Sequence, residues 1–125
     1  MGKTKTVITV ISKISERPVL QDAALVVIHG LDLGRTVDLI KATIVIGRSS
    51  KCDLQIDQES VSRNHARISS SDGKVAVEDL ESTNGTYVND EVVSGKVQLR
   101  NGDLIKVGRT IFKFIAGGNI EAAYH

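Results

Sequence analysis

Short runs rich in β-branched residues, separated by turn residues, constrain the fold of this chain more than any other feature. Gly, Asn and Asp mark the breaks between the runs, as in Asp72-Gly73 and Asn101-Gly102. We expect strands at Ala24–Ile28, Arg35–Leu39, Ile44–Ile46, Leu54–Gln55, Ala66–Ser69, Val75–Asp79, Thr86–Val88, Glu91–Val92, Val97–Gln98, Leu104–Val107 and Thr110–Phe114. No window before the final residues keeps the apolar period of an α-helix. Many short strands at close spacing predict an all-β sandwich of two packed sheets.

The sequence divides into three parts. Residues 1–21 mix Thr and Ser with basic and β-branched residues, so we expect a mobile tail rather than a short edge strand. Residues 22–116 hold every expected strand and have a size at which a single hydrophobic core is usual. Glycines at 117 and 118 close this domain, and residues 119–125 are typical of a capped helix start. They predict a linker toward a further domain.

The balance of charge limits the ligands that this domain can bind. Sixteen Lys and Arg against fifteen Asp and Glu leave a formal charge of +1, without the broad basic field of nucleic-acid-binding proteins. A bound anion must therefore be held by a local cluster of donors. No apolar run reaches the roughly 20 residues that span a bilayer, and residues 1–10 do not resemble a signal peptide. The single cysteine, Cys52, excludes an intramolecular disulfide, and we expect a cytoplasmic protein.

Three expected loops, at residues 47–50, 60–65 and 81–85, concentrate hydrogen-bond donors. Loops at one end of a sandwich can converge although they are far apart in sequence. Their guanidinium, hydroxyl and amide groups belong to Arg48, Arg63, Ser49, Ser62, Thr83, Asn64 and Asn84. One carboxylate, that of Glu81, lies at the edge of this set. Such an inventory suits a dianionic phosphate, whose oxygens accept charge-assisted hydrogen bonds.

The sequence blocks around these loops resemble the FHA (forkhead-associated) domain family. The blocks are IGRSSKCDLQI, SVSRNHARI, DLESTNGTYVN and LRNGDLIKVG, and they occur in this order between residues 24 and 115. The resemblance implies an eleven-stranded FHA-type β-sandwich that binds phosphothreonine peptides at its loop end. Residues 117–125 are similar to the linker that joins FHA domains to GGDEF diguanylate cyclase domains in bacterial signalling proteins.

The resemblance also implies which residues bind the phosphopeptide. Arg48 matches the family arginine that contacts it, a task for which a planar, bidentate guanidinium is better suited than a lysine. Ser62 matches the serine whose hydroxyl donates to a phosphate oxygen, and Arg63 a position that often adds a second contact. Thr83 matches the residue that donates a hydroxyl or a backbone N–H to the phosphate. Asn84 matches the amide that pairs with the peptide backbone.

Further motif residues would support or tune the site. Gly47 is expected to let the chain turn sharply, and the histidine matching His65 is structural in the family, its ring bonding to the loop backbone. Asn84-Gly85 is also an ordinary turn signal, so a pure turn role stays an alternative for both residues. Some members place Arg at the position of Ser60 and use it to prefer an Asp three residues after the phosphothreonine. Here Arg109 is the candidate replacement.

We interpret the chain as a phosphothreonine-binding signalling module that regulates an attached or partner enzyme of the diguanylate cyclase type. The alternative is an FHA-fold scaffold that has lost phosphate binding. No catalysis is expected in this chain, because no GxSxG elbow surrounds Ser62 and a phosphate-cradling GxxxxGK[ST] loop is absent. A longer parent protein could carry the cyclase domain. The isolated histidines indicate no metal, and no cofactor is expected.

Thr4, Thr6 and Thr9 in the tail are candidate phosphorylation sites. A module that reads phosphothreonine could bind its own tail, either in cis or by tail exchange in a dimer. The alternative is a disordered leader whose threonines are never modified. We expect a phosphothreonine-containing protein or peptide as partner, with no nucleic acid and no membrane.

Overall fold

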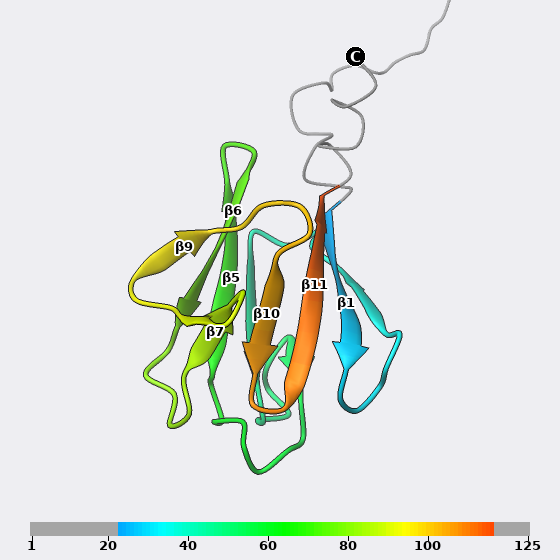
Figure 1. The fold of residues 1–125 in the computed structure, drawn as a ribbon, viewed down its shortest axis with the longest axis vertical. Helices are drawn as coiled ribbons and strands as arrows, with labels where there is room; N and C mark the ends of the chain where they lie inside the picture. Colours follow the sequence, from blue (N-terminus) through cyan, green and yellow to red (C-terminus); the bar gives the residue numbers. More distant parts are fainter. Residues whose placement is uncertain (1–22, 117–125) are drawn as a thin grey trace, which may run out of the picture.

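The computed structural model describes residues 23–116, where eleven strands form two packed sheets (Figure 1). The strands are β1 (Ala23–His29), β2 (Thr36–Asp38), β3 (Thr43–Gly47), β4 (Leu54–Gln55), β5 (Ala66–Ser71), β6 (Lys74–Asp79), β7 (Thr86–Val88), β8 (Glu91–Val92), β9 (Lys96–Gln98), β10 (Leu104–Val107) and β11 (Thr110–Ala116). Every strand expected from the sequence is present, with ends shifted by at most two residues. The expected tail and linker lie outside the described residues. Between residues 23 and 116, no helix has the length and apolar character needed to cross a membrane.

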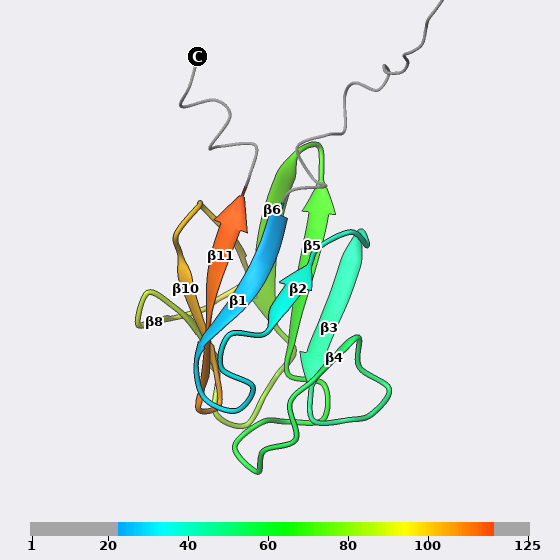
Figure 2. The ribbon, with the colours of Figure 1, turned by 90° about the vertical axis from the view of Figure 1, so that its right-hand side faces the viewer.

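One sheet has six strands in the order β2-β1-β11-β10-β7-β8, and the other has five in the order β4-β3-β5-β6-β9. Figure 2 shows the edge of the sandwich, where β1 and β2 of the first sheet stand beside β3 and β4 of the second. All neighbouring strands are antiparallel except β3 and β4, which pair in parallel. The first and last strands are neighbours, so that Ala23 pairs with Ala116.

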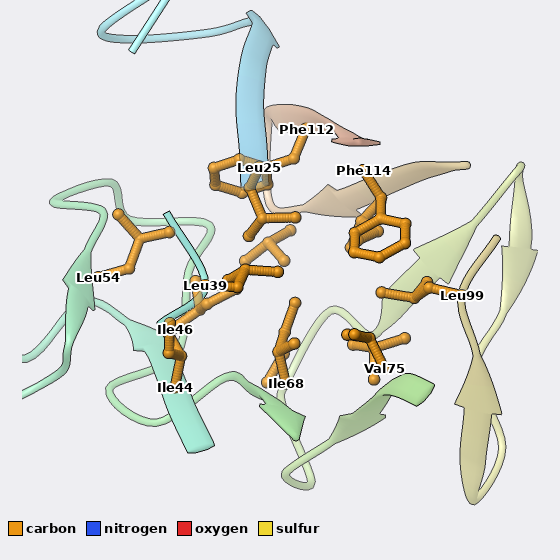
Figure 3. Close-up of a cluster of buried hydrophobic side chains, with 14 of the residues drawn as sticks. Leu25, Leu39, Ile44, Ile46, Leu54, Ile68, Val75, Leu99, Phe112 and Phe114 are labelled. Carbon is orange, nitrogen blue, oxygen red and sulfur yellow. The ribbon is translucent and has the colours of Figure 1, made fainter. Parts of the chain in front are cut away.

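The hydrophobic core lies between the sheets because alternate residues of each strand face inward. In β1 every second residue is buried, from Ala23 through Leu25 to Val27, and β11 buries Phe112 and Phe114 in the same way. These side chains meet those of the second sheet across the sandwich (Figure 3). Burial of one such side chain stabilises the fold by about 1.5–3 kcal/mol.

The connections after β1, β3, β4, β6 and β10 gather at one end of the sandwich (Figures 1 and 2). The opposite end is where β1 begins and β11 ends. The three donor-rich loops predicted from the sequence therefore share one end of the molecule, as loops of a β-sandwich can.

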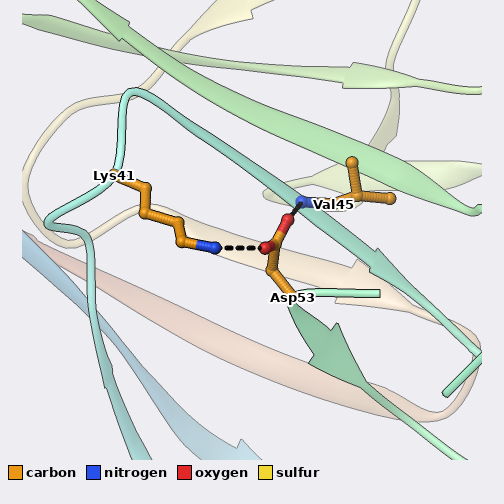
Figure 4. Close-up of polar contacts among 3 residues, drawn as sticks. All are labelled: Lys41, Val45 and Asp53. Atoms are coloured by element: carbon orange, nitrogen blue, oxygen red, sulfur yellow. Dashed lines mark hydrogen bonds and ion pairs between the residues drawn. The ribbon is translucent and has the colours of Figure 1, made fainter. Parts of the chain in front are cut away.

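Asp53 fixes the end of the loop that connects β3 to β4 (Figure 4). Its carboxylate accepts a hydrogen bond from Lys41 Nζ at 2.7 Å and another from the Val45 N–H at 2.9 Å. The Lys41 bond first, and then the Val45 bond, lower the pKa of Asp53 below its ordinary value. Because the Lys41–Asp53 pair is exposed, its main effect is to position the loop rather than to stabilise the fold.

Candidate functional site

A cleft of about 340 Å³ opens where the loops meet. Its lining residues come from three separate loops and are Arg48, Glu59, Ser60, Val61, Ser62, Arg63, Thr83 and Asn84. All five residues that the family resemblance associates with phosphopeptide binding thus surround one opening. Glu59, which was not predicted, also lines the cleft, whereas Glu81 is not part of its lining.

Arg48 is anchored at its base and free at its tip. Its backbone N–H donates to the Ser62 carbonyl at 2.9 Å, and its Nε–H donates to the Val61 carbonyl at 3.0 Å. Among residues 23–116, the two terminal guanidinium nitrogens make no hydrogen bond or ion pair. A planar group held in this way presents two parallel donors to a ligand in the cleft.

Ser62 and Thr83 join two loops across the floor of the cleft. The Thr83 N–H donates to Ser62 Oγ at 2.9 Å. Since Ser62 Oγ acts here as an acceptor, its own hydroxyl proton stays available for a ligand. The sequence left the hydroxyl and the N–H of Thr83 as alternative ligand donors. With the N–H engaged, the hydroxyl is the donor that remains.

Asn84 makes a second connection between the same two loops. Its Nδ2 donates to the Ser60 carbonyl at 2.9 Å, which leaves the other amide proton and Oδ1 for a ligand. Gly85 has a φ of +83°, a conformation that favours glycine, and its N–H donates to Ser82 Oγ at 2.8 Å. Turn chemistry therefore accounts for Gly85, whereas Asn84 also reaches across to another loop.

His65 is fully buried below the cleft and does not line it. The Ser62 N–H donates to its Nδ1 at 3.0 Å, and its Nε2 lies 2.9 Å from the Gly85 carbonyl. Because the serine N–H can only donate, Nδ1 is the acceptor and the ring proton sits on Nε2, where it donates to the carbonyl. The imidazole thus couples the position of Ser62 to that of the Asn84-Gly85 turn.

Asp79 and Ser82 brace the loop between β6 and β7, although neither was predicted as a site residue. The Asp79 carboxylate accepts bonds from Ser82 Oγ at 2.6 Å, from Thr86 Oγ1 at 2.7 Å and from the Ser82 N–H at 3.0 Å. Burial raises the pKa of Asp79, but these hydrogen bonds outweigh it and hold the pKa below its ordinary value. The spacing of Asp79 and Ser82, an Asp three residues before a Ser, is a turn signal from which this arrangement could have been predicted.

Gly47 serves a different purpose from the sharp turn expected of it. It ends β3, it is buried, and its φ lies outside the left-handed region. A Cβ at this position would collide with the Arg63 carbonyl and stand 2.9 Å from Cys52 Sγ. That thiol itself donates to the Arg63 carbonyl at 3.1 Å. The glycine is needed because the loop between β4 and β5 packs directly on the strand.

Ser60 and Arg109 line a second hollow of about 520 Å³ together with Gln58 and Glu59. Glu59 and Ser60 belong to the wall of both the cleft and this second hollow, so the two are neighbours. Ser60 Oγ is buried and has no hydrogen-bond partner among residues 23–116. Over the same residues, no group of three or more His, Cys, Asp or Glu is arranged to hold a metal ion.

Comparison with known proteins connects this fold and site to one family. The FHA domain family model matches residues 44–108, which span β3 to the turn after β10 and include every lining residue of the cleft. A solved FHA domain whose interactions depend on phosphothreonine is 31% identical, with a TM-score of 0.68. The match covers 74% of this chain and 94% of that one.

Two curated relatives are bacterial regulators. The oxoglutarate dehydrogenase inhibitor of Corynebacterium efficiens is 39% identical over 95 residues, which cover 76% of this chain and 66% of that protein. The glycogen accumulation regulator GarA of Mycolicibacterium smegmatis is also 39% identical over 95 residues, covering 76% of this chain and 60% of that protein. The matched region therefore spans less than two thirds of the length of each relative.

Proposed function

The chain belongs to the FHA domain family of phosphothreonine-binding modules, and we propose that the cleft lined by Arg48, Ser62, Thr83 and Asn84 holds the phosphothreonine. One observation carries this proposal. Donors from three loops converge on one opening, and each is fixed by a bond at its base while another donor group stays free. Donors that are already oriented lose little freedom on binding, which favours affinity.

The available donors match the oxygens of a phosphate group. The terminal nitrogens of Arg48 would bind two oxygens, and the hydroxyls of Ser62 and Thr83 would reach the others. Arg63 adds a second positive charge at the rim of the cleft. The amide of Asn84 would pair with the peptide backbone beside the phosphorylated residue.

Val61 gives the cleft an apolar contact that would distinguish phosphothreonine from phosphoserine. The residue is 1% exposed and belongs to the cleft wall. A threonine methyl group packed there would add about 0.8 kcal/mol, or roughly fourfold in affinity. Phosphothreonine also loses less rotational freedom on binding, because its side chain is β-branched.

The regulated partner is proposed from the relatives. One is named as an inhibitor of oxoglutarate dehydrogenase and the other as a regulator of glycogen accumulation. These names favour a metabolic enzyme bound as a separate protein over the diguanylate cyclase that residues 117–125 suggested. Such a role requires binding alone and no catalytic residue in this chain.

A second candidate function is recognition of the chain's own tail. Thr4, Thr6 and Thr9 precede β1 within the first 22 residues, so a phosphorylated tail would always be tethered to the cleft. Tethering raises the effective concentration to roughly the millimolar range, at which a weak site is occupied. An occupied cleft would exclude outside partners, or join two copies by tail exchange.

The Arg48→Ala variant tests the main proposal. Calorimetry with a phosphothreonine peptide chosen from an oriented library should show a loss of about 2–5 kcal/mol of binding free energy. Circular dichroism should show a folded protein, because Arg48 is exposed and loss of its Nε–H bond to the Val61 carbonyl should lower the stability by only about 0.5–1.5 kcal/mol. Arg100→Ala, which removes an exposed arginine outside the cleft, is the matched control and should bind as before.

Unphosphorylated and phosphoserine peptides complete this experiment. The first should not bind, and the second should bind several times more weakly. Undiminished affinity in a folded Arg48→Ala protein contradicts the assignment of the cleft. Failure of every phosphothreonine peptide to bind the unaltered chain would instead favour a scaffold that has lost phosphate binding.

A further inference from the structure

A third hollow opens at the edge of the sandwich, between the β1–β2 loop and β4. Its volume is about 370 Å³. Apolar side chains form much of its wall, namely Val27, Leu31, Leu54, Ile56 and Phe112. They come from both sheets and from the loops beside them, so the hollow lies where the two layers part.

The wall of this hollow is continuous with the hydrophobic core. Phe112 and Leu54 are each 1% exposed, and Val27 is 3% exposed. Side chains packed this tightly keep their positions, so the hollow has a defined shape. Contact between water and such an apolar surface is unfavourable. An apolar group that displaces the water from the hollow would therefore lower the free energy.

Leu31 stands at the lip of the hollow with 57% of its surface exposed. The short loop that carries it is held by backbone bonds. The Gly34 N–H donates to the Val27 carbonyl at 2.8 Å, and the Arg35 N–H donates to the Asp32 carbonyl at 2.9 Å. An ordered loop therefore presents an apolar side chain to solvent beside an apolar opening.

The third hollow adjoins the phosphate cleft through the second hollow. Gln58 lines the second and Thr110 lines the third, and Thr110 Oγ1 donates to Gln58 Oε1 at 3.1 Å. Glu59 and Ser60 then form a wall shared by the second hollow and the cleft. The three openings are thus connected through neighbouring wall residues at the loop end of the molecule.

Charge at the rim indicates what should flank the apolar group. Asp32 is paired with Arg35 at 3.6 Å, whereas Asp57 makes no ion pair among residues 23–116. A lysine or arginine in the ligand would complement this carboxylate.

We propose that the third hollow binds an apolar side chain of the same peptide segment whose phosphothreonine occupies the cleft, with a basic residue next to it facing Asp57. This inference rests on the proposed function of the cleft. Two linked contacts bind far more tightly than either alone, so the second contact selects among phosphothreonine segments that the cleft by itself would treat alike.

The test is a positional scan with the full chain. Phosphothreonine peptides of one length, with otherwise uncharged polar residues, carry a Leu-Lys pair that is moved one position at a time along both sides of the phosphothreonine. Calorimetry should show one position at which affinity exceeds that of the peptide lacking the pair by about tenfold or more. The same affinity at every position overturns the proposal.

Two variants of one loop locate the contact. Leu31→Glu places a charge at the lip of the hollow and should abolish the gain from the Leu-Lys pair. Leu33→Glu is the matched control, because Leu33 is 69% exposed on the same loop and does not line the hollow, and it should keep the gain. A gain that survives in Leu31→Glu, or that is lost equally in both variants, overturns the proposal.

The outcomes separate this inference from the proposed function. If peptides bind through the phosphothreonine but show no positional gain in affinity, the proposal for the third hollow is contradicted and the assignment of the cleft stands. If no phosphopeptide binds, both the proposal for the third hollow and the assignment of the cleft are contradicted. In either case circular dichroism of each variant establishes that it is folded.

Discussion

His65 and Asp79 shape the cleft although neither lines it. His65 connects Ser62 to Gly85, and Asp79 gathers Ser82 and Thr86 around one carboxylate. Both side chains satisfy backbone or hydroxyl groups that would otherwise be left unpaired inside the loops. The geometry of the exposed donors therefore depends on polar groups underneath them.

We predict that His65→Ala lowers both stability and phosphopeptide affinity. The substitution leaves the Ser62 N–H and the Gly85 carbonyl without their partner, at about 1–3 kcal/mol for each buried group. Thermal unfolding and calorimetry measure the two effects. His29→Ala, at an exposed histidine in β1, should change neither. Lost affinity with an unchanged melting temperature would show that His65 acts on the ligand rather than on the loops.

A second prediction concerns acid stability. The pKa of Asp79 is lower in the folded chain than the ordinary value of 3.8, so its stabilising effect is complete above that value. The effect is lost as the pH falls through the lower folded pKa. Asp79→Asn should therefore unfold more easily than the unaltered chain at neutral pH, and the difference should shrink below about pH 4. Denaturant titrations across pH test this, and a constant difference would contradict it.

At the scale of elements, the β10–β11 turn supports the loop that follows β4. Gly108 in this turn lies so close to that loop that a Cβ would stand 2.6 Å from Ser60 Oγ and 2.7 Å from Val61 Cγ2. Its φ of +61° is in the left-handed region as well. The turn and the loop are thus packed without space for a methyl group.

We predict that Gly108→Ala weakens phosphopeptide binding, whereas Gly73→Ala does not. Gly73, in the β5–β6 turn, has a φ of +77° and open space around it. Both alanines are strained by about 1–2 kcal/mol, because left-handed backbone is unfavourable for residues with a Cβ. Only the alanine at 108 must also displace the loop that carries Ser62. Equal affinities of the two variants for the same phosphopeptide would show that the β10–β11 turn does not influence the binding site.

Local sequence patterns were sufficient to predict the strands. Even the two-residue β4 was expected, in a short run flanked by the turn residues Asp53 and Asp57. Arg35 and Leu39, expected at the two ends of β2, lie just outside it. Each still bonds to β1, because the Val27 N–H donates to the Arg35 carbonyl and the Leu39 N–H to the Ala23 carbonyl, both at 2.9 Å. The parallel pairing of β3 with β4 was not predicted, since it depends on contacts that no local pattern contains.

The site was predicted as far as its residues lie in contiguous motifs. Arg48, Ser62 and Thr83 stand in blocks that the family shares, and the structure brings them to one cleft. Glu59 and the apolar third hollow were missed, because their surroundings are created only when distant segments pack together. How these residues contribute to binding stays a prediction until the variants are measured.

At the scale of the whole molecule, β1 begins at the end of the sandwich opposite to the loops that follow β3, β4 and β6 (Figure 1). These three loops carry the lining residues of the cleft. The seven residues of β1 span about 23 Å at 3.3 Å each. The segment from Thr9 to Ala23 can extend to about 46–50 Å. A phosphorylated tail is therefore long enough to reach the cleft of its own chain.

We predict that a phosphorylated peptide of residues 1–15 binds the chain lacking that segment more tightly than a scrambled phosphothreonine peptide does. The intact chain phosphorylated at Thr6 or Thr9 should resist outside peptides and remain a monomer, because tethering favours the intramolecular complex. Calorimetry and sedimentation measure these properties. A concentration-dependent dimer would indicate tail exchange instead. Equal affinity for the tail peptide and the scrambled peptide would contradict self-recognition.

The pairing of Ala23 with Ala116 has a consequence for engineering. Cross-strand partners lie only about 4.5–5.5 Å apart, so both ends of the domain leave from nearly the same point. Residues 23–116 could be inserted into a surface turn of a host protein without increasing the distance between the two ends of that turn. The joined ends would also permit circular permutants with new termini at the β5–β6 turn, where Gly73 has open space around it. Such permutants would place a reporter far from the phosphopeptide and leave its approach unobstructed.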